Sequence, residues 1–306
     1  MKINIISKLP GKADKKTISL RSKHFIIGIL LMLPALASIL VFKYLPMIMG
    51  SFISFFDFDI VNMPGKFVGL QNYIRAFTDK KFYTTISHNL IMFVYSMLMN
   101  FWVPIFMAIL INEIRKGKTF FRVGYFIPGC APGIAMAVLW KYFWQPDYGL
   151  ANHLIGLLGI SPQLWLNDPN WVYFCLYFPG LVICGGMNLV IYLAALQNVS
   201  QELYEAAMID GAGIGKRIFH VTLPQIGSSI ALLFSLSLIA ILNQMENVMV
   251  MTNGGPYGTS ETVLLYAYKQ AVNSYDYSYA MTMITIVFIV SLVMNIVVNW
   301  MKDRER

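Results

Sequence analysis

Long apolar runs separated by short polar segments dominate this chain. Six strongly apolar runs contain no charged residue over 18 positions or more. Crossing a hydrocarbon core of about 30 Å takes about 20 helical residues. Lipid offers no water to backbone polar groups, so such runs must be helices rather than open sheet. The pattern predicts an all-α membrane protein with six transmembrane helices, at residues 25–42, 89–112, 123–140, 171–199, 221–245 and 277–301.

The few charged residues indicate how these helices are oriented. Hydrophobic residues make up 57% of the chain and charged residues 12%, with a net charge of +8. Most of the Lys and Arg residues lie before the first run, after the second and fourth runs, and at the end of the chain. By the positive-inside rule these segments are cytoplasmic, as are both termini. The loop at 46–87 also carries four basic residues, but its length and three acids make it less decisive. The charge therefore indicates topology and does not predict nucleic acid binding.

We expect one membrane domain at 25–301, a basic cytoplasmic arm at 1–24 on the lipid surface, and a cytoplasmic tail at 302–306. The arm and first run resemble a secretory signal with a cleavage site at 35–37. The apolar run continues to Phe42 and the arm is long, so we expect no cleavage. Pro-Gly and Gly-Gly pairs at 128–129, 132–133, 179–180 and 185–186 predict kinks or tight packing around a central path. The alternative is that Gly and Pro are simply common in membrane helices.

The segment at 145–170 has no Lys or Arg and reads as a short hairpin at the outer membrane surface. We interpret Trp144, Trp165 and Trp171 as an aromatic belt at the membrane interface. A platform on which a sugar stacks is the alternative. Docking of a binding protein above these residues is compatible with either.

The glycine-rich run at 211–217, GAGIGKR, is not a nucleotide-binding loop. Asp210 stands where the first glycine of that motif belongs, and Arg217 replaces the hydroxyl residue that would hold magnesium. The three cysteines and four histidines have no metal-like or catalytic spacing. We therefore predict no enzymatic activity, no metal and no cofactor for this chain.

The polar segment at 200–224 predicts two short helices at an angle. Ser200 can cap the first helix, Glu202 favours its dipole, and Gly211 can turn the chain with positive φ. We expect a second helix to begin at 216–220 and to end near Pro224. Together they would form a projecting knob that seats in a groove of another protein.

The spacing within this knob resembles the signature loop of ATP-binding-cassette (ABC) importer permeases. Glu-Ala-Ala is followed after three residues by Gly211, and after nine more by Val221, one residue, and Leu223-Pro224. The runs TNGGP at 252–256 and FFRVGYFIP at 120–128 resemble the carbohydrate-uptake branch of this family. The resemblance implies a type I importer fold and an ATPase-docking role for Glu205, Ala206, Ala207 and Gly211. It also implies a second homologous permease in a heterodimer, two ATPase subunits, an extracellular solute-binding protein and a sugar substrate.

Polar side chains in the fourth and fifth runs suggest a ligand path, because they are costly in lipid unless they pair or face water. Amides and hydroxyls suit sugar hydroxyls, whereas an amino acid or phosphate would require a fixed charge. The maltose-type resemblance places the path at Cys184, Met187, Asn188, Ser237, Ala240, Ile241 and Gln244. The alternative for each residue is a packing contact between helices.

Two other classes of protein remain as alternatives: an ion-coupled secondary carrier, or a membrane scaffold that transports nothing. The chain shows no repeated halves and no charge in the middle of a span, where carriers usually place coupling sites. The knob at 200–224 argues against both classes.

Overall fold

The computed structural model describes residues 15–58, 65–114, 116–183 and 186–304. It divides into two compact units, residues 1–52 and 53–306, which are described separately. The described elements, in chain order, are α1 (Lys15–Ile39), the π-helical turn η1 (Leu40–Tyr44), α2 (Leu45–Ile53), β1 (Phe56–Asp57), β2 (Lys66–Phe67), α3 (Gln71–Thr78), α4 (Lys80–Ser96), the π-helical η2 (Met97–Phe101), α5 (Trp102–Glu113), α6 (Lys118–Gly129), α7 (Gly133–Phe143), α8 (Leu150–Gly156), the 3₁₀ turn η3 (Trp165–Asn167), α9 (Val172–Ile183), α10 (Met187–Gln197), α11 (Gln201–Ile209), α12 (Ile214–Arg217), the π-helical η4 (Ile218–Thr222), α13 (Leu223–Gln225), α14 (Gly227–Leu242), α15 (Glu246–Met251), α16 (Val263–Asn273) and α17 (Tyr277–Arg304).

The first unit is a nearly continuous helix whose stretch Ile27–Ile53 is apolar and long enough to cross a membrane. Its large hydrophobic side chains are exposed, among them Leu31 and Phe42. An apolar helix with exposed side chains on every face is suited to a lipid environment. The predicted arm at 1–24 lies outside the described residues up to position 14, and α1 already begins at Lys15.

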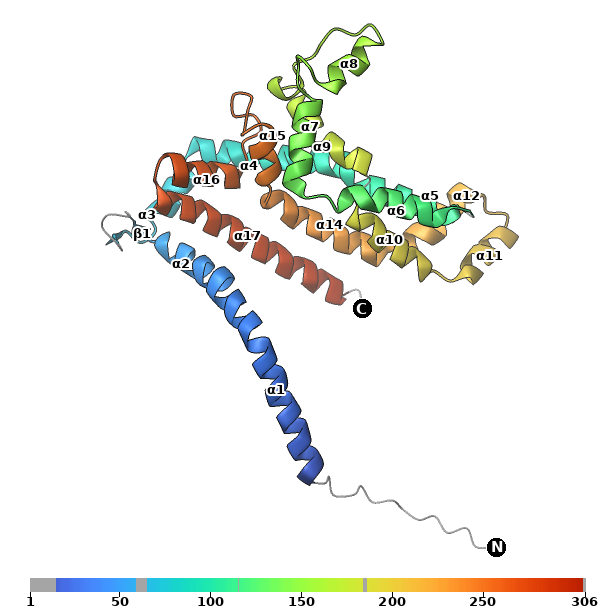
Figure 1. The fold of residues 1–306 in the computed structure, drawn as a ribbon, viewed down its shortest axis with the longest axis horizontal. Coiled ribbons are helices and arrows are strands. Elements are labelled where there is room, and N and C mark those ends of the chain that lie inside the picture. Colours follow the sequence, from blue (N-terminus) through green and yellow to red (C-terminus); the bar gives the residue numbers. More distant parts are fainter. Residues whose placement is uncertain (1–14, 59–64, 115, 184–185, 305–306) are drawn as a thin grey trace. The chain divides into compact units, whose positions relative to one another are not determined.

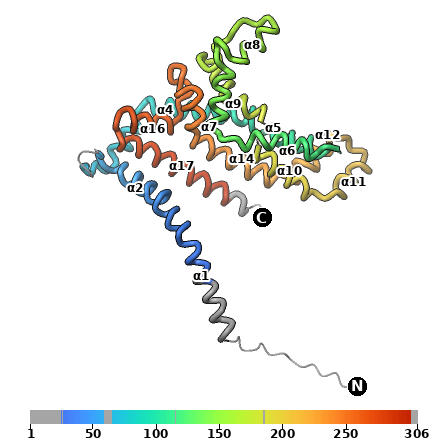
Figure 2. The backbone as a smooth tube through the Cα atoms, viewed as in Figure 1, coloured from blue at the N-terminus to red at the C-terminus, as the bar shows by residue number. Residues whose placement is uncertain are grey.

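In the second unit, two uninterrupted helical stretches, Lys80–Glu113 and Tyr277–Trp300, can cross a membrane. Three bent pairs also have the required length and composition: α6 with α7, α9 with α10, and the segment Ile214–Gln225 with α14. Together with the first unit this gives three straight spans among the described residues, or six if each bent pair counts as one. Figures 1 and 2 show the long helices of this unit running side by side, with α3 and α16 at one end and α11 and α12 at the other.

The predicted kinks in the third and fourth runs are present at two of the four predicted pairs. The 89° bend between α6 and α7 falls at 130–132, beside the pair at 132–133, and the 45° bend between α9 and α10 falls between Ile183 and Met187, at the pair at 185–186. The other two pairs do not end a helix, because Pro128 and Pro179 lie inside α6 and α9. Proline removes one backbone hydrogen bond, which can kink a helix without ending it.

The two bends meet at a pair of glycines. A Cβ atom added to Gly129 would lie 2.6 Å from the Cα of Gly186, and one added to Gly186 would lie 2.9 Å from the Cα of Gly129. Gly186 also has a φ of +46°, which L side chains rarely adopt. The backbones of α6 and α10 can therefore approach this closely only because both positions lack a side chain.

Hydrogen bonds and ion pairs hold α3, α4, α16 and α17 together at one end of the unit. Asp79 accepts hydrogen bonds from the hydroxyls of Tyr266 (2.8 Å) and Tyr279 (2.7 Å). Glu261, which is almost fully buried, pairs with Lys269 (2.8 Å) and Lys81 (3.1 Å). The Lys269 amine also donates to the carbonyl of Asn253, so the same network fixes the TNGGP loop.

Two of the three tryptophans predicted to form an interfacial belt belong to the protein core. Trp144 is 3% exposed and Trp165 is 7% exposed, and their rings pack 4.9 Å apart. The indole of Trp165 donates to Asn152 of α8, which fixes the hairpin at 145–170. Of the three, Trp171 alone keeps substantial exposure, at 38%. The belt interpretation was therefore wrong for Trp144 and Trp165, which stabilise the hairpin from inside.

Candidate functional sites

Two adjoining cavities lie where the bent helices meet α14 and α15. Their volumes are about 350 Å³ and about 450 Å³, and four residues line both: Gly133, Tyr177, Gln244 and Asn247. The first cavity extends between α7 and α9 toward Trp140 and Met251, and the second extends along α14. Residues of several elements therefore converge on one polar-lined space within the apolar helices.

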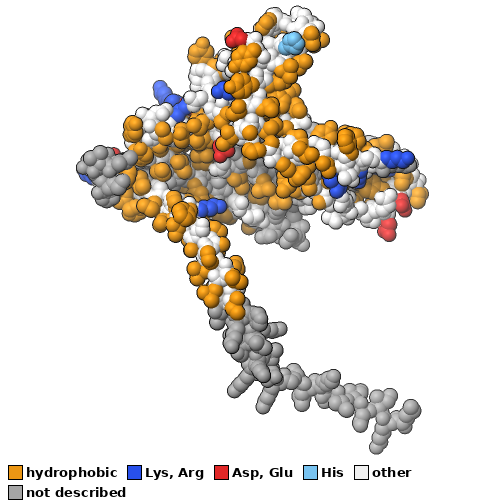
Figure 3. Space-filling model, in the orientation of Figure 1, with side chains coloured by type: hydrophobic (Ala, Val, Ile, Leu, Met, Phe, Trp, Pro, Cys, Tyr) orange, Lys and Arg blue, Asp and Glu red, His pale blue; other side chains and the backbone are white. Residues whose placement is uncertain are grey.

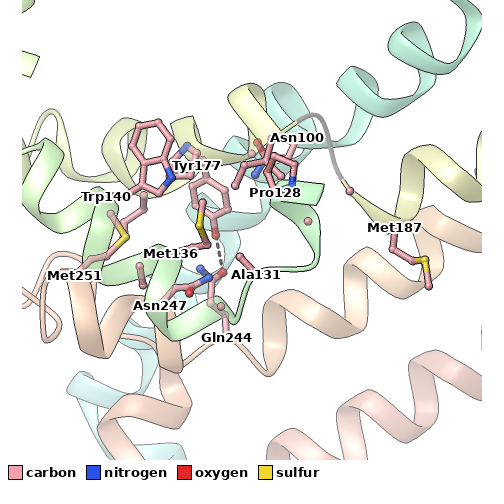
Figure 4. A pocket seen from close by; sticks show the side chains of 18 residues that line it. Asn100, Pro128, Ala131, Met136, Trp140, Tyr177, Met187, Gln244, Asn247 and Met251 are labelled. Carbon is pink, nitrogen blue, oxygen red and sulfur yellow. Dashed lines mark hydrogen bonds between the residues drawn. The ribbon is translucent and has the colours of Figure 1, made fainter. Parts of the chain in front are cut away.

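A hydrogen bond crosses the region that the two cavities share. The Tyr177 hydroxyl of α9 donates to the side-chain oxygen of Gln244 at 2.6 Å (Figure 4). Gln244 lies just beyond α14, which ends at Leu242, and α15 begins at Glu246. Four polar residues cluster around this break: Asn243, Gln244, Glu246 and Asn247. In a continuous helix their side chains would point to different faces.

Most of the predicted path residues reach these cavities. Ser237, Ala240, Ile241 and Gln244 line the second cavity, and Met187 lines the first. Asn188 is partly buried and lines neither cavity. Cys184 lies outside the described residues.

The sequence analysis missed several lining residues from other helices: Ser96, Asn100 and Tyr177. Asn100 stands in the middle of the apolar run at 89–112, where an amide is costly, and that signal could have identified it. The side-chain amide of Asn100 packs against the backbone of Gly180. A Cβ atom at position 180 would clash with this amide, so the contact requires glycine there. Tyr177 carried no such signal, because tyrosine is common in membrane helices.

The chemistry of the lining is that of neutral hydrogen bonding beside aromatic surface. Amides of Asn100, Gln244 and Asn247 face the space together with Tyr177 and Trp140. Among the described lining residues the one charged side chain is Glu246, and none is Lys, Arg or His. Such a surface can donate to and accept from hydroxyl groups, and it offers no cation to an acidic ligand.

The predicted knob at 200–224 is present at the opposite end of the unit from α16 (Figure 1). The Ser200 hydroxyl accepts from the backbone N–H of Glu202 and caps α11. Gly211 has a φ of +74°, as expected for the turn between the two helices. The second helix begins two residues before the expected start, at Ile214, and continues as η4 and α13 to Gln225, so it ends near Pro224 as expected.

The surface of the knob combines charge with exposed hydrophobic side chains. Glu205 and Ala206 are exposed, and Ala207 is partly buried. Five large hydrophobic residues are also exposed, at 40% to 86%: Leu203, Met208, Ile209, Ile214 and Phe219. Figure 3 shows charged side chains gathered at this end of the unit, beside orange hydrophobic surface. An exposed apolar surface rimmed by charge is typical of a site that binds another protein.

Comparison with known proteins defines the family. Residues 103–304 match the family described as binding-protein-dependent transport system inner membrane component. The trehalose/maltose transport system permease protein MalF of Thermococcus litoralis is 31% identical over 281 residues, which are 90% of this chain and 94% of the relative. The probable ABC transporter permease protein YurN of Bacillus subtilis is 29% identical over 279 residues, 90% of this chain and 95% of the relative.

The fold matches a solved structure over almost its whole length. The crystal structure of a bacterial ABC transporter involved in the import of the acidic polysaccharide alginate gives a TM-score of 0.81 at 25% identity, covering 95% of this chain and 99% of that chain. A second structure, of an alginate transporter in complex with an alginate pentasaccharide-bound periplasmic protein, gives a TM-score of 0.80. This chain belongs to the family of permease subunits of binding-protein-dependent ABC importers, in the branch for sugars and oligosaccharides, and is a multi-pass membrane protein.

Proposed function

We propose that this chain forms half of the translocation path of an ATP-driven importer of a sugar or oligosaccharide. It crosses the cytoplasmic membrane six times, as a type I importer permease with both termini in the cytoplasm. The knob at 200–224 faces the cytoplasm, and the TNGGP loop and the hairpin at 145–170 face outward. The chain itself hydrolyses no ATP.

The observation that carries this proposal is the surface of the knob. Its hydrophobic side chains, led by Ile209 at 86% exposure, contribute little to the packing of the chain itself. Leaving such side chains in water is unfavourable by about 25 cal/mol for each Å² of apolar surface. A groove on an ATPase subunit would cover them, and Glu205 would meet a basic residue there. Gly211 holds the two helices at the angle that the groove receives.

The substrate class follows from the lining of the cavities. Ser237 and Gln244 carry the neutral groups that the sugar would contact, and Ala240, Ile241 and Met187 supply apolar surface. Because the described lining has no basic side chain, we propose an uncharged sugar, in contrast to the acidic polysaccharide named for the structural neighbour. The polar atoms of sugar hydroxyls would replace the contacts that Gln244 and Tyr177 now make with each other.

The partners are proposed from the family and from the knob. A second, homologous permease completes the path, and the TNGGP motif identifies this chain as the first of the two subunit types. Two ATPase subunits bind from the cytoplasm. A solute-binding protein delivers the sugar from outside, in keeping with the second structural neighbour, an alginate transporter in complex with a pentasaccharide-bound periplasmic protein. An ion-coupled carrier or a scaffold would have no use for the knob.

Co-purification tests the assembly. The chain is tagged, expressed with its genomic neighbours, extracted in mild detergent and isolated. We expect an ATPase and a second six-span permease in the isolated complex. Recovery of neither with the intact chain, while the chain itself is folded and membrane-inserted, would refute the proposed function.

A further inference from the structure

The helix α11 of the knob turns one narrow side toward the rest of the chain. Along its nine residues, Tyr204 and Ala207 are partly buried and the other seven are exposed. α11 packs against η4, the π-helical segment Ile218–Thr222 of the second knob helix. Its acids Glu202 and Glu205 form no ion pair with any described residue. The position of α11 relative to η4 therefore depends on very few side chains.

One hydrogen bond between side chains joins the two helices. The Tyr204 hydroxyl lies 3.1 Å from the hydroxyl of Thr222, which is 3% exposed. The Thr222 hydroxyl donates its own proton to the backbone carbonyl of Arg217, at 3.4 Å. Either hydroxyl can donate in the Tyr204–Thr222 bond, and Tyr204 is the donor whenever Thr222 donates to Arg217, because a hydroxyl has one proton to give. A buried acceptor of this kind is costly to leave without a partner.

Thr222 is also the residue from which the chain leads into the membrane path. It is the last residue of η4, and α13 follows directly. After a 68° bend at Ile226 the chain continues as α14, whose residues Ser237, Ala240 and Ile241 line the cavity. Movement of α11 can be transmitted toward α14 by two routes: along the backbone through the turn at Gly211, or through the hydrogen bond between Tyr204 and Thr222. A Cβ atom added at Gly211 would meet no described atom within 4 Å, so nothing packed against the turn prevents it from flexing.

We propose that Tyr204 is a positioning residue for coupling: its hydroxyl fixes α11 against η4, so that movement of the docked ATPase displaces α14 instead of bending the knob at Gly211. This rests on the proposed function, in which the knob docks an ATPase. Tyr204 itself need not touch the ATPase.

The test uses changes that remove a hydroxyl and little else, in the complete complex reconstituted in vesicles. Tyr204→Phe and Thr222→Val each remove one side of the contact, and Thr222→Ser keeps the hydroxyl. Tyr192→Phe is the matched control, because the Tyr192 hydroxyl is buried in the same unit and has no hydrogen-bond partner among the described residues. The readouts are sugar transported per ATP hydrolysed, recovery of the ATPase with the tagged chain, and the distance distribution between spin labels at Glu202 of α11 and His220 of η4, which are both exposed.

Tyr204→Phe and Thr222→Val should broaden the distance distribution and lower the sugar transported per ATP about two- to tenfold, with normal recovery of the ATPase. The double variant should be no worse than Thr222→Val alone, because that change already removes the contact with Tyr204. Thr222→Ser and Tyr192→Phe should match the unmodified complex. A distance distribution and coupling ratio for Tyr204→Phe equal to those of Tyr192→Phe would overturn the inference. Absence of the ATPase from the unmodified complex would instead refute the proposed function, and the spin-label distances would still report on the contact.

Discussion

The side-chain oxygen of Gln244 accepts a 2.6 Å hydrogen bond from the hydroxyl of Tyr177, across the space that the two membrane cavities share. The maltose-type resemblance places Gln244 in the same ligand path as Ser237. The two residues do line the same cavity, but Gln244 reaches it from the break after α14. A ligand hydroxyl that donates to the Gln244 oxygen would have to compete with Tyr177 for it.

Replacement of Gln244 with alanine should lower the apparent affinity for the transported sugar and leave assembly intact. One lost hydrogen bond corresponds to about 0.5–1.5 kcal/mol, or roughly two- to tenfold in affinity. Uptake kinetics and sugar-stimulated ATP hydrolysis in vesicles measure the effect. Asn188→Ala is the comparison, since Asn188 lines neither cavity and its loss should have a smaller effect. Equal kinetics for Gln244→Ala and the unmodified protein would place the sugar elsewhere.

The glycine pair at the two helix bends gives a prediction about stability. Gly129→Ala would bring a methyl group to within 2.6 Å of the Gly186 Cα, which is too close for any packing. Such overpacking costs about 1–3 kcal/mol. Gly124→Ala is the matched control: it lies on the same helix, α6, with no described atom within 4 Å of the added methyl. The midpoint of thermal unfolding of the purified complex should be lower for Gly129→Ala and unchanged for Gly124→Ala. Equal midpoints for the two variants would contradict the close approach of α6 and α10 at Gly129 and Gly186.

The topology can be determined by cysteine labelling with a reagent that does not cross membranes. Cysteines introduced at Asn167 and Thr259 should react in intact cells, because both residues lie in segments proposed to face outward. Cysteines at Lys118 and Lys216 should react only after the membrane is permeabilised. Reaction of position 216 from outside would contradict the six-span arrangement.

Asp79 predicts a dependence of stability on pH. Partial burial opposes its ionisation, but hydrogen bonds from the hydroxyls of Tyr279 and Tyr266 and from backbone N–H groups outweigh this effect and lower the pKa of the carboxyl below its ordinary value of 3.8. The pKa is lower in the folded protein, so the ionised carboxylate stabilises the fold above pH 3.8. That contribution is lost as the pH falls through the lowered pKa.

The midpoint of thermal unfolding should therefore be higher for the unmodified complex than for Asp79→Asn at neutral pH. The difference should shrink as the pH falls below 3.8. A difference that stays constant across this range would show that the charge of Asp79 does not stabilise the fold.

The apolar runs predicted the spans well because their signal is strong and local. Each run of uncharged residues corresponds to a helix or a bent pair of helices of sufficient length. The location of the bends was less predictable. The pairs at 132–133 and 185–186 mark the two breaks, whereas Pro128 and Pro179 have the same local signal but lie inside helices. The contact between Gly129 and Gly186, which are far apart in sequence, accompanies the breaks and could not be predicted locally.

The knob was predictable where its structure is set by neighbouring residues. The cap at Ser200 and the positive φ of Gly211 both follow from the local sequence and are present. The exposure of Ile209 and Phe219 could not be inferred, because an isoleucine or phenylalanine in a polar loop is equally consistent with a buried anchor. The Tyr204–Thr222 contact depends on the angle between two helices, which no spacing along the chain determines.

The central claim is that the knob couples ATP hydrolysis to sugar transport, and one pair of variants tests it most directly. Gly211→Val and Gly215→Val both place the new side chain in open space, but Gly211 alone of the two has a positive φ, which valine cannot adopt without strain. Both complexes are reconstituted in vesicles, where sugar uptake and ATP hydrolysis are measured together. The account predicts that Gly211→Val loses the ATPase or hydrolyses ATP without uptake, while Gly215→Val transports normally. Normal ATPase recovery and normal coupling in Gly211→Val would contradict it.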